Sequence, residues 1–70
     1  MSNQYFFRIN GLNDNESVDQ LEQVLKSIEG VEFVEVDLET GMASVRSSAT
    51  SEKLTAIIDQ AGYNAVLVSD

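Results

Sequence analysis

Two amphipathic helical patterns, each lying between strand-like segments, limit the possible folds of this 70-residue chain more than any other feature. Apolar residues recur three and four positions apart in both patterns, which places them on one face of a helix. The two stripes consist of Val18, Leu21, Leu25 and Ile28, and of Leu54, Ile57, Ile58 and Ala61. The first helix is predicted from Val18 to Ile28, and Thr50 is the expected N-cap of the second. Each helix needs a sheet or another helix against which to bury its stripe.

Four further segments alternate side chains with the period of a strand. They are Tyr5–Ile9, Val31–Leu38, Met42–Arg46 and Asn64–Ser69, with the turn Glu39-Thr40-Gly41 joining the middle two. The residues expected to face the helices are Phe7, Ile9, Val34, Val36, Ala43, Val45, Ala65 and Leu67. The order βαββαβ, with right-handed crossovers, predicts a ferredoxin-like α+β sandwich in which one antiparallel sheet carries both helices on one face. We expect residues 1–70 to form one such domain.

The composition excludes several classes of function. The chain has no cysteine and no histidine, which removes disulfides, thiolate metal sites, imidazole ligands and the commonest general base. The sequence contains no glycine-rich phosphate loop. It also has no pair of acidic residues in surroundings that would separate their pKa values, so an enzyme is not expected. Twelve acidic residues against four basic ones give a net charge of −8, which argues against nucleic acid and anionic membranes as partners. No apolar run is long enough for a membrane span, and a cytoplasmic location is expected.

The polar stretch Gly11–Ser17 connects the first strand to the first helix and is the candidate site. Two helix-start patterns overlap in it: Asn13 with Glu16, and the capping box of Ser17 with Gln20. Acidic side chains at a helix start are most simply explained as caps that favour the positive end of the dipole. The alternative is a hard-cation site formed by Asp14, Glu16 and Asp19, although their spacing matches no calcium motif.

Four separated pieces of the chain resemble the heavy-metal-associated domain of copper chaperones and of P-type ATPase N-terminal modules. Ile9 to Ser17 corresponds to the family pattern V-x-G-M-x-C-x-x-C, and Gly30 to Val36 corresponds to G-V-x-x-V-x-V. Leu38 to Gly41 corresponds to L-x-T-G, and Ala61-Gly62-Tyr63 to A-G-[YF]. The resemblance runs without gaps from about Phe7 to Val66 and implies the same ferredoxin-like fold.

The resemblance also implies where a metal would bind and what is missing. In the family, two cysteines hold Cu(I) or Zn(II) at this loop, and here they correspond to Asp14 and Ser17, while the loop methionine corresponds to Leu12. Because Cu(I) prefers soft sulfur ligands, no resident Cu(I) or Zn(II) of the family kind is expected. The loop positions Asp14, Glu16 and Ser17 remain candidate metal ligands only in the alternative of an oxygen-ligated ion bound by the loop Asn13–Ser17.

The expected function is therefore that of a non-enzymatic protein-docking or regulatory module related to metal transport. The resemblance implies a protein partner, either a P-type ATPase module or a second copy of the chain. Phe6, Val66 and Val68 should lie together on the open face of the sheet, with Phe33 as a separate exposed aromatic. They form either an interaction patch or a surface partly covered by the side-chain stems of Arg8 and Arg46. Tyr63 corresponds to the family position beside the metal loop, where packing over the loop is the simpler interpretation and partner binding the alternative.

Overall fold

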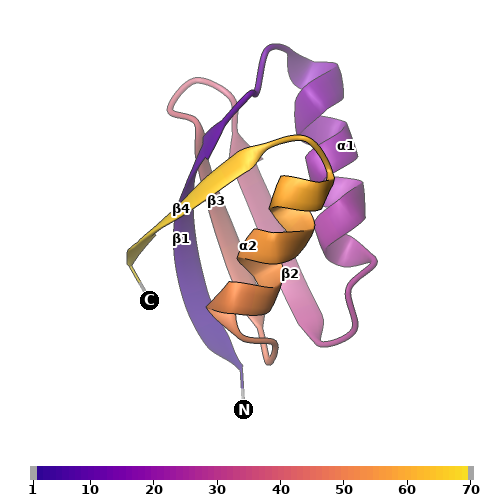
Figure 1. Ribbon diagram of the computed structural model, residues 1–70, viewed down its shortest axis with the longest axis vertical. Helices are drawn as coiled ribbons and strands as arrows, with labels where there is room; N and C mark the ends of the chain where they lie inside the picture. Colours follow the sequence, from indigo (N-terminus) through magenta and orange to yellow (C-terminus); the bar gives the residue numbers. More distant parts are fainter. Residues whose placement is uncertain (1, 70) are drawn as a thin grey trace.

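The computed structural model describes residues 2–69 and has the predicted order of elements. β1 (Asn3–Asn10) leads into α1 (Asn15–Lys26), followed by the hairpin of β2 (Val31–Asp37) and β3 (Met42–Ser47). α2 (Ser51–Gln60) and the last strand, β4 (Asn64–Ser69), complete the fold. Figure 1 shows both helices on one side of the sheet. The predicted ferredoxin-like sandwich is confirmed.

The sheet has the order β2-β3-β1-β4, and every pair of neighbouring strands is antiparallel. β1 and β3 are central, so their inward side chains lie under both helices and form the middle of the core. The buried apolar residues come from all four strands and both helices, and they are Tyr5, Phe7, Ile9, Leu21, Leu25, Ile28, Val34, Ala43, Val45, Leu54, Ile58 and Ala65. The helical and strand periodicities thus predicted most of the core.

Three residues expected in the core lie outside it. Val18 is half-buried and is not among the residues that form the core or pack against it. Leu67 pairs with Phe7 and so lies on the helix side of the sheet, but it is 40% exposed because β4 is an edge strand. Ala61 is exposed because it is the C-cap of α2 rather than part of its buried stripe. The strands also differ slightly from the expected segments, since β1 begins at Asn3 and β2 ends at Asp37.

The ends of α2 explain how the chain enters β4. The Thr50 side chain accepts a hydrogen bond from the Lys53 N–H, as predicted for the N-cap. At the other end, Gly62 has φ +99° and donates to the Asp59 carbonyl, while the Tyr63 N–H donates to the Ile58 carbonyl. This pair of bonds is a Schellman motif, in which glycine supplies the positive φ. The motif turns the chain so that Tyr63 lies next to the loop after β1.

Candidate functional site

The loop between β1 and α1 ends at Asp14, which is the N-cap of the helix. Asp14 Oδ1 accepts hydrogen bonds from the Ser17 backbone N–H and from the Ser17 hydroxyl, each at 2.9 Å. Neither of the two expected helix starts is therefore correct: Asn13 precedes the cap, and Ser17 lies within the first turn. The interpretation of Asp14 as a capping acid is confirmed.

The capping bonds favour the charged form of the Asp14 carboxyl. The Ser17 backbone N–H and then the Ser17 hydroxyl hold the pKa of Asp14 below its ordinary value of 3.8, and slight desolvation opposes them. The group is therefore an anion at neutral pH, with one oxygen engaged by two donors. Glu16 lies exposed in the first turn, where it also suits the positive end of the helix dipole.

Tyr63 fastens this loop to the other end of the chain. Its hydroxyl lies 3.3 Å from the Ser17 carbonyl oxygen and 3.4 Å from Gln20 Oε1, both of which accept. Its ring covers Gly11, because a Cβ built on Gly11 would lie 3.3 Å from Tyr63 Cδ1. Tyr63 thus packs over the loop, as the simpler interpretation predicted. The pairing with Gly11 and Gln20 was not predicted, because it joins positions about fifty residues apart.

The donor set of the loop does not fit a soft metal ion. Asp14 supplies carboxylate oxygens and Ser17 a hydroxyl that already donates to Asp14, whereas Cu(I) selects thiolate or thioether sulfur. Among residues 2–69, no group of three or more histidine, cysteine, aspartate or glutamate side chains is placed to hold a metal ion. Asp14, Glu16 and Ser17 share the start of α1 but do not form such a group.

A shallow, open depression lies beside the β2–β3 hairpin, and sequence reasoning did not predict it. It measures about 600 Å³ and is lined by Asn15, Glu35, Val36, Asp37, Leu38 and Glu39. Asp37 Oδ1 accepts a hydrogen bond from the Glu39 N–H at 2.9 Å, so this carboxylate supports the turn. The acidic side chains that line the depression are exposed to solvent.

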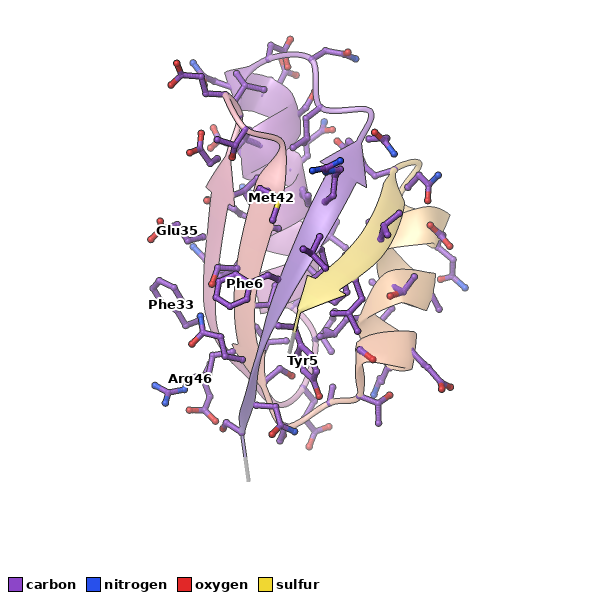
Figure 2. All side chains as sticks on the ribbon, turned by 90° about the vertical axis from the view of Figure 1, so that its left-hand side faces the viewer. Tyr5, Phe6, Phe33, Glu35, Met42 and Arg46 are labelled. Carbon is purple, nitrogen blue, oxygen red and sulfur yellow. The ribbon has the colours of Figure 1, made fainter. Side chains whose placement is uncertain are left out.

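The sheet face away from the helices is open, and the three residues of the predicted patch are exposed there. Phe6, Val66 and Val68 are 39%, 52% and 54% exposed, and they come from the neighbouring strands β1 and β4. Phe33, 49% exposed, lies on the edge strand β2. Figure 2 looks onto this face and shows Phe6 and Phe33 together with Arg46 and Glu35.

The comparisons with known proteins agree with the fold. The family model of the heavy-metal-associated domain matches residues 6–64. Among curated proteins, none matches the chain significantly. Among residues 2–69, no helix has the length and apolar character needed to span a membrane.

Several solved structures are similar over nearly the whole chain. The copper(I)-loaded first domain of the human copper chaperone for SOD1 is 28% identical, with a TM-score of 0.88, covering 99% of this chain and 96% of that one. Oxidized MerP from Ralstonia metallidurans is 22% identical, with a TM-score of 0.92 and coverages of 99% and 100%. The N-terminal domain of PacS from Synechocystis is 21% identical, with a TM-score of 0.91 and coverages of 96% and 98%. Since the family model covers most of the chain, this protein belongs to the heavy-metal-associated domain family.

Proposed function

We propose that this protein is a non-enzymatic, heavy-metal-associated-like module that does not carry a soft metal ion and acts by docking to a protein partner in metal transport. The observation that carries the proposal is the capping geometry at Asp14. The carboxylate stands where the family resemblance implies a thiolate, and it binds the start of its own helix instead. A docking or regulatory role keeps the fold and the loop without the metal ligands.

The fold keeps two surfaces that such a partner can contact. One is the loop end, where Tyr63 covers Gly11 and is hydrogen-bonded to the first turn of α1. The other is the open sheet face with Phe6, Val66 and Val68. The chain belongs to the heavy-metal-associated domain family and is 28% identical to a domain of the human copper chaperone for SOD1. The proposed partner is a P-type ATPase module or a second copy of the chain, and the proposed location is cytoplasmic.

The oxygen-ligated alternative has weaker support. Calcium needs six or more oxygen ligands. In the loop Asn13–Ser17, one oxygen of the Asp14 carboxylate already accepts two hydrogen bonds from Ser17. Glu16 and Asp19 lie on α1 itself rather than in a loop that surrounds an ion.

A copper competition experiment tests the proposal. The purified chain is titrated with Cu(I) against a chelator while the amide NMR signals of residues 11–18 are followed, and no stoichiometric uptake is expected. The variant Asp14→Cys/Ser17→Cys, which restores two sulfur donors at the helix start, should take up Cu(I). The control Asp19→Cys/Glu22→Cys has the same spacing within the helix and should bind more weakly, because it lacks the positive helix end.

Each outcome of the titration has a clear meaning. Tight Cu(I) or Zn(II) binding by the unmodified chain at this loop would contradict the proposal. Saturable shifts with Ca²⁺ or Mg²⁺ at residues 11–18 would favour the oxygen-ligated alternative. Failure of the Asp14→Cys/Ser17→Cys variant to bind would show that the loop has lost more than its sulfur atoms.

A further inference from the structure

The open face of the sheet differs in charge from the rest of the molecule. Two of the four basic residues, Arg8 and Arg46, lie on it, together with the acidic Glu35 and Asp37. The face is thus neutral, and the remainder of the chain carries the entire net charge of −8. The two acids are on the edge strand β2, whereas the two arginines are on the central strands β1 and β3.

The strand registers place these side chains in three rows across the sheet. Arg8 is opposite Met42 and Val66, Phe6 is opposite Ser44, and Arg46 is opposite Gln4. Phe6 therefore lies between the levels of the two arginines. Because Arg46 pairs with a residue four positions before Arg8 on β1, the two arginines are separated by about 14 Å along the strand direction.

The two guanidinium groups are available to a partner. Among the side-chain hydrogen bonds of residues 2–69, none is donated by Arg8 or Arg46. Figure 2 shows Arg46 extending from the sheet into solvent. The polar groups at the centre of the face satisfy each other instead, since Gln4 Nε2 donates to Ser44 Oγ at 2.7 Å. Phe6, Met42 and Arg46 on this face are also of residue types enriched in protein interfaces.

From this arrangement we infer that the open face binds an amphipathic helix of another protein in which two acidic residues flank an apolar stripe. Carboxylates seven positions apart lie on one side of a helix and about 10 Å apart, within reach of both long arginine side chains. Apolar residues three and four positions after the first carboxylate then contact Phe6. The partner's stripe thus reads acidic-x-x-apolar-apolar-x-x-acidic.

The edge strands select the path of this helix. Glu35 and Asp37 repel an acidic partner from the β2 side, while Val66 and Val68 on β4 offer apolar surface on the other side. β1, with eight residues, is about 27 Å long, which equals the length of an 18-residue helix. A helix there adds a third layer to the sandwich. This inference rests on the proposed docking function and specifies its partner.

The test uses two synthetic 18-residue helical peptides with the same leucine stripe, one with glutamate and one with lysine at the two flanking positions. The isotope-labelled protein is titrated with each peptide. Although the protein has a net charge of −8, we expect it to bind the glutamate peptide more tightly than the lysine peptide. The amide shifts should gather on β1, β3 and β4, near Phe6, Ser44 and Val66.

Charge reversal supplies the control. Arg8→Glu/Arg46→Glu should bind the glutamate peptide about tenfold more weakly or worse and should prefer the lysine peptide. Lys26→Glu/Lys53→Glu changes the net charge equally but reverses the two lysines of the helices, so it should keep the wild-type preference. Retention of the wild-type dispersion of amide signals shows that the Arg8→Glu/Arg46→Glu variant is folded.

Several results would overturn the inference. A wild-type preference for the lysine peptide, or equal binding of both, would show that bulk charge governs the face. Self-association in sedimentation that Arg8→Glu/Arg46→Glu abolishes would identify a second copy as the occupant. Binding to vesicles of anionic lipid through the same arginines would identify a membrane surface. None of these results depends on Cu(I) uptake, so the proposed lack of a soft metal site is tested separately.

Discussion

Replacing Gly11 with alanine should destabilise the protein for two separable reasons. The residue has φ +106°, a backbone conformation that side-chain-bearing residues rarely adopt, and a cost of about 1–3 kcal/mol is expected for it. The new Cβ would also lie 3.3 Å from Tyr63 Cδ1, so the ring must shift by a few tenths of an ångström. Gly62→Ala is the matched control, because φ is +99° there and nothing lies within 4 Å of the new Cβ.

The magnitudes follow from this comparison. Gly62→Ala should lower the free energy of unfolding by about 1–2 kcal/mol through backbone strain alone. Gly11→Ala should cost about 1 kcal/mol more, since crowding a packed contact typically costs 1–3 kcal/mol and this ring can partly yield. For a domain of this size, about 1 kcal/mol lowers the melting temperature by about 4–8 °C, so the difference between the two variants is measurable.

The assay is urea unfolding followed by circular dichroism, in the wild type and in a Tyr63→Ala background. Removing the ring should eliminate the excess cost of Gly11→Ala and leave the backbone cost in place. The reasoning would be refuted if Gly11→Ala cost no more than Gly62→Ala in the wild type. It would also fail if the excess persisted after Tyr63 had been truncated, because the loop would then not be held by that ring.

Three further perturbations address the caps and the core. Because the folded-state pKa of Asp14 is lowered, its stabilising effect is complete above its ordinary pKa of 3.8 and is lost as the pH falls through the lower folded value. Asp14→Asn should therefore flatten the acid side of a plot of urea midpoint against pH, and an unchanged slope would contradict the assignment of the cap. Leu25→Ala, at a fully buried position, should cost about 2–5 kcal/mol, whereas Leu67→Ala at a 40% exposed one should cost less than about 1 kcal/mol in thermal unfolding. Thr50→Ala should cost about 1 kcal/mol, and full retention of stability in urea would show that α2 does not depend on its N-cap.

The fold could be predicted from the periodic segments, because the spacing of their apolar residues reflects which side chains are buried in each helix or strand. Leu21 and Leu25 are buried as their helical spacing predicts, and Phe7 and Ile9 as their alternation in a strand predicts. The predicted start of α1 was wrong because it was chosen from short sequence motifs. In the structure, the N-cap is the residue whose side chain reaches the Ser17 N–H, which is Asp14.

The family resemblance placed Tyr63 over the loop, but the residues that it contacts there could not be read from the sequence. The contact of Tyr63 with Gly11 depends on how the Schellman turn directs the chain after α2. Arg8 and Arg46 are separated by most of the chain, and their common face follows from the register of β1 against β3. The alternation of the strands had already placed both arginines on the outer side, but their order along the face, with Phe6 between them, became visible only once β1 and β3 were paired.

The two edges of the sheet are protected against aggregation to different extents. β2 carries the carboxylates Glu32, Glu35 and Asp37, whereas β4, the opposite edge, contains no charged residue from Asn64 to Ser69. Charged edges prevent strands of separate molecules from zipping together. At neutral pH, the carboxylates of β2 therefore oppose pairing of this edge with β4 of another molecule. Uncharged residues at those three positions would leave β2 as open to strand addition as β4.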